Sequence, residues 1–578
     1  MQPFPLRTAT ALLVAGLLTV PPSPGLAADW RALEQGVAVK VEGDWREGRG
    51  VVADEIAIRP DGAGDVEIVA PLQAVDAGSG TVTVLGASMS GAAASVRTAD
   101  RTPLELSSLA TGEWVEIDGD WDGSAVVVKR ITRLAEPGSD VEIDGPVTSP
   151  SPAPRRIEVA GVVVALGSDT ELEGGGREQL VQRAVDDDEE VGALWSAAGG
   201  RIRVGGRLEA AVEPEDNFDL NDARPGDYTE AQWVGDFQAE ARLHPEVDAF
   251  VKTGFTATRV LKDEEQDESD QTDWRLQQAY GVWQPTDDLA LQAGRQDFDE
   301  GREWLYDENL DGLRLHLRHG IVRTEASVST RWNTDARHLR EWTNWIVNTR
   351  VTVARRWEAG AYVLARRNSA AGRNEDPVWF GVRSSGRVSS PVRHWAELSF
   401  LRGVLDGVQR DAWAADVGLR VRLARRGRPT VTAGYAVGSG GLDEGTHFRQ
   451  TGLHDNNDKF GGVTSFRYYG ELLDPELANL SVATAAFGFR PMRSTSIDFV
   501  AHAYTQRQAW PRLFDADVDM RPTGLDTDIG RELDVIVGFE EIPNVDVEYV
   551  FALFRPGEAF PDTATDARFH KLEIKFRF

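Results

Sequence analysis

The sequence contains no cysteine among its 578 residues. This absence excludes a disulfide framework, a thiolate metal site and a lipid-modified cysteine. The chain also lacks an apolar run long enough for a transmembrane helix, and only 41% of its residues are hydrophobic. Basic residues are in the minority, with 62 Lys and Arg against 93 Asp and Glu, a formal net charge of −31. That balance excludes the basic footprint of a nucleic-acid-binding protein.

Residues suited to catalysis or metal binding are sparse. The 9 histidines are scattered, and His447, His454, Asp455 and Asp458 lack the tight spacing of metal ligands. The glycine-rich run 438–441 follows a strand pattern but opens no helix, so a phosphate loop is not indicated. We therefore expect no catalytic residue, no metal site and no cofactor, and we do not expect an enzyme.

Alternation of apolar and charged residues is the dominant pattern in the second half of the chain. At the C-terminus, Leu572, Ile574 and Phe576 alternate with charged residues, and the last residue is Phe578. The same period of two occurs at 313–318, 416–423 and 545–551. A strand with this pattern has one apolar and one polar face. In a long chain with 17 Trp and a C-terminal aromatic, the pattern is typical of an outer-membrane barrel with a lipid-facing and a lumen-facing side.

Connection lengths support the barrel. Eight compact connections, such as 284–288, 357–360 and 541–544, alternate with longer polar ones, such as 438–479 and 508–530. Short turns at one end and long loops at the other are typical of outer-membrane barrels. The tally predicts an all-β, antiparallel transmembrane barrel of 18 strands, with 16 as the alternative. An even number of strands would leave both barrel ends on the periplasmic side.

The N-terminal part reads as an export signal followed by a small β module. Arg7, the apolar stretch 9–20 and the small residues before Asp29 predict a signal peptide over 1–28. Residues 29–195 carry an internal repeat, in which two Gly-Asp-Trp turns precede β-branched runs, at 43–45 and 119–121. This part resembles small domains of unknown function, OB-like in pattern, from bacterial envelope proteins. We expect a periplasmic module that binds a partner or acts as a spacer, followed by a barrel over 196–578.

Strand phase predicts that many basic residues of the barrel point into the lumen. Such an interior attracts anions, because guanidinium groups form forked hydrogen bonds with carboxylates. The alternative is that these residues pair with lumen carboxylates and brace the wall. The predicted lumen residues are Lys252, Arg314, Arg318, Arg350, Arg383, Arg420 and Arg422.

Four ordered motifs resemble those of the alginate export porins. They are Gly-Arg-Gln at 294–296 with Glu-Trp at 303–304 and Asn-Leu at 309–310; the set 434–441, 448–453, 469–471 and 476–480; 528–534; and 553–559. The resemblance covers about 201–578. It implies an 18-stranded outer-membrane barrel that exports an anionic uronate polysaccharide through an arginine-lined, loop-gated, anion-selective pore. By motif position it implies that Arg295 lines the pore, although strand phase leaves its facing open.

The partners that follow are outer-membrane lipid, the barrel assembly machinery through Phe578, and an anionic polysaccharide or other anionic solute. Two alternatives remain at this point. One is a general or small-solute porin. The other is a structural envelope protein whose N-terminal module binds a partner.

Overall fold

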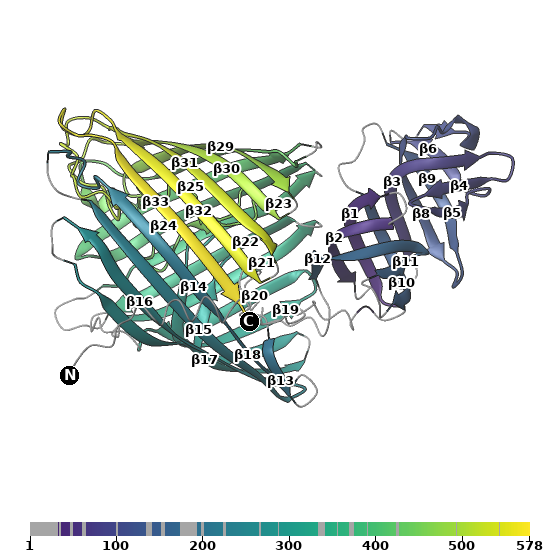
Figure 1. The fold of residues 1–578 in the computed structure, drawn as a ribbon, viewed down its shortest axis with the longest axis horizontal. Helices are drawn as coiled ribbons and strands as arrows, with labels where there is room; N and C mark the ends of the chain where they lie inside the picture. Colours follow the sequence, from purple (N-terminus) through teal and green to yellow (C-terminus); the bar gives the residue numbers. More distant parts are fainter. Residues whose placement is uncertain are drawn as a thin grey trace.

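The computed structural model describes two β units (Figure 1). Among the described residues, no helix has the length and apolar character needed to cross a membrane. The expected signal peptide and the residues that join the two units lie outside the described residues. The described residues are 33, 36–46, 50–59, 65–99, 102–134, 141–151, 156–173, 193–197, 201–223, 227–264, 268–286, 288–332, 342–354, 357–368, 375–389, 391–423, 427–492, 494–542 and 544–578.

The smaller unit, residues 38–173, is a sheet of 12 strands, and we call it the N-terminal module. Its elements are β1 (Ala38–Arg46), β2 (Gly50–Arg59), β3 (Asp65–Asp76), β4 (Thr81–Val84), β5 (Ala87–Ser90), β6 (Ser95–Thr98), β7 (Pro103–Leu104), the 3₁₀ turn η2 (Leu106–Ser108), β8 (Trp114–Trp121), β9 (Val126–Arg133), β10 (Val141–Ser151), β11 (Arg156–Val159) and β12 (Val162–Glu173).

Strand pairing closes this sheet into two five-stranded barrels. The first ring runs β10-β11-β12-β2-β1 and closes through the β1–β10 pair. The second runs β3-β4-β5-β9-β8 and closes through the β3–β8 pair. In each ring the third strand lies parallel to its next neighbour, β12 beside β2 and β5 beside β9. This is the strand order of an OB-fold, a five-stranded Greek-key barrel. The expected small β module is therefore confirmed.

The two barrels exchange strands, which explains the sequence repeat. The first repeat contributes β1 and β2 to the first barrel and β3, β4 and β5 to the second. The second repeat contributes β8 and β9 to the second barrel and β10, β11 and β12 to the first. The two barrels meet where β3 pairs with β10, at Ile68 and Ile143. Trp45 of the first repeat packs on Gly86 of the second barrel, where an added Cβ would lie 3.1 Å from the ring. In the equivalent contact, an added Cβ on Gly161 would lie 3.7 Å from the Trp121 ring. The two Gly-Asp-Trp segments thus occupy equivalent positions, but they are not the turns that the sequence predicts: each lies at the end of a strand, β1 or β8, directly after a register shift at its glycine.

The larger unit is an antiparallel barrel. Its strands are β13 (Ala193–Ala197), β14 (Ile202–Asp216), β15 (Tyr228–His244), β16 (Val247–Asp263), β17 (Gln271–Thr286), β18 (Leu289–Asp299), β19 (Asp307–His319), β20 (Val322–Thr330), β21 (Trp342–Ala354), β22 (Trp357–Asn368), β23 (Val378–Ser389), β24 (Val392–Leu405), β25 (Val408–Arg422), β26 (Thr430–Gly438), β29 (Leu480–Met492), β30 (Thr495–Gln506), β31 (Asp528–Ile542), β32 (Val545–Pro556) and β33 (Ala567–Arg577). The 3₁₀ turn η4 (Glu444–Thr446) and the short pair β27 (Asn457–Asp458) and β28 (Phe466–Arg467) lie between β26 and β29.

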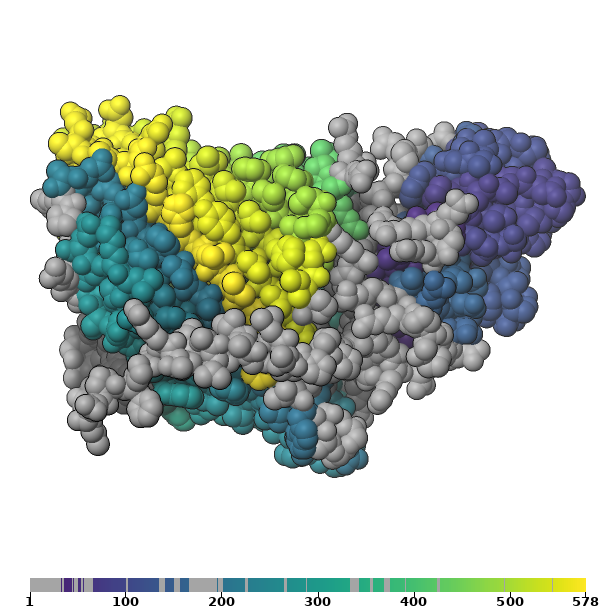
Figure 2. Space-filling model, viewed as in Figure 1, coloured from purple at the N-terminus to yellow at the C-terminus, as the bar shows by residue number. Residues whose placement is uncertain are grey.

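Pairing of β14 with β33 closes the barrel with 18 strands, as predicted. The short β13 pairs with β14 outside this ring, so the expected boundary after residue 195 falls within β13. Compact connections gather at one end of the barrel, which we call the turn end, and the longer ones at the other, the loop end. The connection 406–407 is the exception, because it is short and lies at the loop end. The N-terminal module lies beside the turn end (Figures 1 and 2).

The two faces of the barrel wall differ as the sequence alternation predicts. On β33, Leu572 and Ile574 are exposed by 46% and 47% on the outer face, whereas Glu573 is only 5% exposed on the inner face. Because large exposed apolar side chains dominate the outer face, it suits contact with lipid. Exposed apolar side chains of this face include Trp233, Trp274, Trp283, Trp345, Val382, Val417 and Leu419.

Candidate functional site

The connection between β26 and β29, residues 439–479, runs inside the barrel, and we call it the central loop. Val463 donates its backbone N–H to Ser496 Oγ at 2.9 Å, and Leu472 donates to the Glu532 carboxylate at 2.7 Å. Both acceptors lie on the inner face of the wall. Successive side chains of a strand point to opposite faces, and the alternate residues of β30 and β31, such as Phe499 and Leu533, are exposed on the outer face. The loop therefore fills the lumen. It shares one apolar core with the wall, to which it contributes Phe448, Leu453, Phe460, Phe466, Tyr468, Tyr469, Leu473 and Leu477.

A second loop, which joins β18 to β19, fastens the central loop to the wall through Arg302. Its guanidinium lies 2.9 Å from Asp416 on β25 and 2.7 Å from Asp458 of the central loop. The same group lies over the rings of Tyr468, at 4.2 Å, and Trp395, at 4.6 Å. Arg302 thus joins three separate segments of the chain by charge and by ring contact.

Residues of two sequence motifs meet beside Arg302. Trp304 is buried and donates its indole N–H to Tyr469 Oη at 2.9 Å. Gln450 donates to the backbone carbonyl of Trp304 at 3.2 Å, and Phe448 stacks on the Trp304 ring at 5.9 Å between centroids. Tyr504 on β30 donates to the Tyr469 carbonyl at 2.8 Å. The motifs are far apart in the sequence but build one lumen junction.

Arg295 lies on the outer face of the barrel. It pairs in register with Ala279 and with Asp311, which has the same phase as the exposed Leu313. Its guanidinium is 3.0 Å from the Asp311 carboxylate. The neighbouring Gln296 is the motif residue that points inward, and it is fully buried. The register therefore does not bring Arg295 to the lumen with the other predicted residues.

The other predicted lumen residues lie on the inner face, and most have partners in the protein. The Arg314 guanidinium is 2.8 Å from Glu325, and Arg318 is 3.1 Å from Asp288. These ion pairs brace the wall, which is the alternative role that the sequence left open. The inward residues are Lys252, Arg314, Arg318, Arg350, Arg383, Arg420 and Arg422, judged from the exposed side chains of opposite phase.

Two further inward arginines contact other parts of the protein. Arg383 bonds Glu300 and lies 3.0 Å from Glu397. Arg420 donates to the Lys459 carbonyl of the central loop at 2.6 Å. Carboxylates and the central loop therefore occupy much of the basic inner surface.

The inward arginines form two rows across neighbouring strands, which sequence phase alone did not reveal. In the first row, Arg318 pairs in register with Arg323, and Arg323 with Arg350. Beyond Gly360 of β22, the next strand carries Arg383 at the same level. Like charges that face each other across strands are destabilising, so the row costs stability. Within the described part of the chain, Arg350 makes no hydrogen bond or ion pair.

The second row lies at the rim of the turn end, and we call it the rim row. Arg387 on β23 pairs with Arg393 on β24, which pairs with Arg420 on β25. Arg387 and Arg393 were not among the predicted residues, although both have the inward phase of their strands. The alternation in 392–401 would have identified Arg393.

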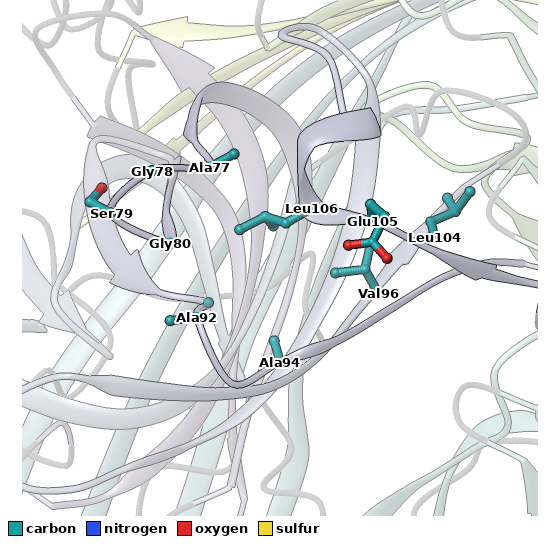
Figure 3. Close-up of a pocket in the computed structure, with 11 residues that line it drawn as sticks. Ala77, Gly78, Ser79, Gly80, Ala92, Ala94, Val96, Leu104, Glu105 and Leu106 are labelled. Carbon is teal, nitrogen blue, oxygen red and sulfur yellow. The ribbon is translucent and has the colours of Figure 1, made fainter.

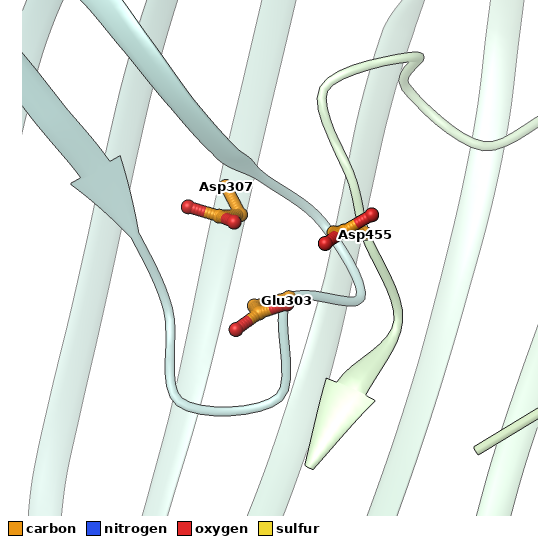
Figure 4. A group of neighbouring side chains, drawn as sticks. All are labelled: Glu303, Asp307 and Asp455. Carbon is orange, nitrogen blue, oxygen red and sulfur yellow. The ribbon is translucent and has the colours of Figure 1, made fainter. Parts of the chain in front are cut away.

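Three carboxylates gather where the loop before β19 meets the central loop (Figure 4). One oxygen of each of Glu303, Asp307 and Asp455 lies within 4.8 Å of the others. Burial, followed by the charges of Asp307 and Asp455, raises the pKa of Glu303 to about 9. Oxygen ligands of this kind suit a hard cation. The two nearby histidines bond within the central loop instead: His447 bonds the Gly441 carbonyl at 2.8 Å, and His454 Nδ1 accepts the Gly452 N–H at 3.2 Å.

A shallow recess of about 310 Å³ lies in the N-terminal module (Figure 3). It lies between the β3–β4 turn, the β5–β6 connection and η2. Among the described residues that line it, Glu105 is the only charged one, and the others are small or aliphatic. A single carboxylate is not a set of metal ligands, so this recess does not define a site.

A closed 18-stranded barrel with an apolar outer face, a charged inner face and loops folded into its lumen defines a channel-type protein of the outer membrane. A family profile described as "Alginate export" matches residues 200–572. The chain belongs to this family. A second profile, "Domain of unknown function (DUF5666)", matches residues 70–132 within the N-terminal module.

Two relatives share the barrel sequence. The alginate production protein AlgE of Pseudomonas aeruginosa is 25% identical over 352 residues, which cover 50% of this chain and 70% of the relative. AlgE of Azotobacter vinelandii is 31% identical over 147 residues, which cover 22% of this chain and 28% of the relative. Among solved structures, OccK11 (OpdR) of P. aeruginosa covers 65% of this chain and 95% of its own, with 13% identity and a TM-score of 0.45.

Proposed function

We propose that the protein exports an acidic, alginate-like polysaccharide through the barrel lumen, with the turn end in the periplasm and the loop end outside. The observation that supports this most is the first arginine row, on β19, β20, β21 and β23. A wall built only for stability would avoid arginines that face each other across strands. A ligand with repeated negative charges offsets that repulsion.

A uronate chain matches such a row chemically. Each sugar carries one carboxylate, and guanidinium binds carboxylate with two parallel hydrogen bonds. Neighbouring strands are about 4.8 Å apart, so arginines in register form closely spaced binding positions. A polymer can then pass its carboxylates from one arginine to the next. Conduction needs such multiple weak positions rather than one tight site.

The central loop sets a condition on transport, because it fills the lumen. Its apolar residues pack on the wall, and Arg302 fastens it to Asp416. A polymer can pass only when this loop moves away from at least part of the wall. The structure therefore corresponds to a closed channel under this proposal, and the loop acts as the gate.

The test is block of single-channel current by polyuronate added to the periplasmic side of a planar bilayer. Arg350→Ala is the main variant, because among the described residues Arg350 makes no hydrogen bond or ion pair, and nearby Glu325 keeps its pair with Arg314. Arg275→Ala is the matched control, since Arg275 is exposed at the loop end and pairs with Asp273. We expect Arg350→Ala to weaken block about tenfold, as loss of one charge-assisted hydrogen bond predicts. Equal block of wild type by a neutral polysaccharide of the same length would refute the proposal.

A further inference from the structure

The N-terminal module contacts the barrel through a specific charged pair. Glu42 on β1 accepts a hydrogen bond from Arg387 Nη1 at 3.3 Å. Arg387 is the first member of the rim row, beside Arg393 in register. Arg387 lies near the end of β23 at the turn end, and the module lies beside that end (Figure 1). A carboxylate of the protein itself thus binds one of the three arginines of the rim row.

The surroundings of Glu42 hold its carboxylate in place. On β1, Val39 and Val41 point into the module core and are fully buried. The opposite face of the same strand is also covered, since Lys40 is 4% and Glu42 7% exposed. The outer face of a small barrel is normally open to water, so a covered charged face marks a contact surface. Lys40 bonds Glu42 and lies 2.7 Å from Glu142 on the neighbouring β10.

We propose that the N-terminal module docks on the rim row and closes the turn end of the pore, with Glu42 in the position that a uronate carboxylate would take on Arg387. Docking itself does not depend on the proposed function; only the identity of the competing ligand does. A glutamate and a uronate present the same anionic group to guanidinium at neutral pH. An arriving polymer therefore competes with Glu42 for Arg387 and releases the module from the rim.

This contact differs from the gate formed by the central loop. The central loop bonds to β25, β30 and β31 inside the lumen, whereas Glu42 reaches the end of β23 from another unit of the chain. The module would respond to polymer on the periplasmic side, before the polymer reaches the lumen arginines. Two closures in series would keep the outer membrane sealed in the absence of substrate.

Because the chain has no cysteine, docking can be tested by paired cysteines in the full-length protein. Glu42→Cys with Arg387→Cys, treated with a short bismaleimide, should give an intramolecular crosslink. Asp122→Cys with Arg387→Cys is the control, because Asp122 lies in the exposed β8–β9 turn of the other small barrel. Equal crosslinking of both pairs, or none in the first with the barrel folded, would overturn docking.

The competition is tested with Arg387 intact. Full-length Glu42→Gln should be blocked by periplasmic polyuronate about tenfold more readily than wild type, because one charge-assisted hydrogen bond no longer opposes the polymer. Glu158→Gln, exposed on β11, is the control and should behave as wild type. An unchanged block in Glu42→Gln would overturn the competition.

A generic polycarboxylate separates the two proposals. If polyglutamate gains the same advantage in Glu42→Gln while polyuronate blocks neither protein, the docking inference stands and the proposed export of polyuronate fails. If both polymers block wild type and Glu42→Gln equally, the carboxylate competition fails and the proposed export stands.

Discussion

Arg302 Nη2 lies 2.9 Å from the Asp416 carboxylate, and this pair connects a loop at the barrel mouth to the inner wall of β25. Asp416 also accepts the indole N–H of Trp395 at 2.8 Å and the hydroxyl of Tyr469 at 3.2 Å. Both oxygens of the Asp416 carboxylate therefore accept hydrogen bonds. It fixes the closed position of the central loop, because the other arm of Arg302 holds Asp458.

Replacing Arg302 by Met should loosen this junction. Loss of one partner leaves Asp416 buried without its counter-charge, at a cost of about 3–5 kcal/mol. We expect a lower midpoint of heat unfolding and more frequent channel openings. Arg275→Met, at an exposed pair, is the control and should change the midpoint little. A midpoint equal to wild type in Arg302→Met would show that the ion pair does not hold the loop.

Glu532→Gln should release the centre of the loop from β31. The Glu532 carboxylate accepts the backbone N–H groups of Leu472, at 2.7 Å, and Leu473, at 3.0 Å. An amide keeps only one acceptor oxygen, so at least one N–H loses its partner. Hydrogen exchange at Leu472 and Leu473 should accelerate, while Glu558→Gln in an exposed loop leaves it unchanged. Unchanged protection in Glu532→Gln would contradict the assigned contact.

The junction of the two loops should weaken as the pH rises from mildly acidic to alkaline values. The pKa of Glu303 is raised to about 9 by burial and by Asp307 and Asp455, so its carboxyl group is protonated at neutral pH in the folded protein. Between the ordinary value of 4.5 and about 9 only the folded protein keeps this proton, so stability is lost over that range and changes no further above it. Protection factors at 303–307, which correct for the intrinsic rise of exchange with pH, should therefore fall over that range in wild type. Glu303→Gln should show no such fall, and an identical profile in both would contradict the assignment.

Gly86→Ala should destabilise the N-terminal module selectively. Gly86 has φ +77°, and an added Cβ would press on Trp45 at 3.1 Å. The left-handed backbone alone costs a non-glycine residue about 1–2 kcal/mol. Limited proteolysis of the full chain should cut the module faster while the barrel stays intact. Gly78→Ala, in an exposed turn with negative φ, serves as control.

The barrel strands could be predicted from the sequence because the alternation of side chains along a strand depends only on neighbouring residues. Successive residues on a strand alternate between lipid and lumen, so 571–578 and 416–423 show their faces without any knowledge of the partners. Turn positions are less certain. The compact connection expected at 357–360 lies within β22, since the register already pairs Ala354 with Trp357.

The contacts between the loops that fill the lumen could not be predicted in the same way. Trp304 and Tyr469 are 165 residues apart, and their contact depends on how two loops fold back into a closed barrel. Exchange of strands in the N-terminal module has the same origin, because β1 pairs with β10 from the second repeat. The facing of Arg295 is settled by its pairing with Ala279 and Asp311, which lie on neighbouring strands. Such features depend on tertiary contacts rather than on period.

The most direct test of the central claim is the reversal potential of the full-length protein in a planar bilayer under a salt gradient, with and without polyuronate. An electropositive lumen predicts anion selectivity that polyuronate reduces and that Arg350→Ala weakens. Conductance without anion preference, equally insensitive to polyuronate and to Arg350→Ala, would contradict an arginine-lined export pathway.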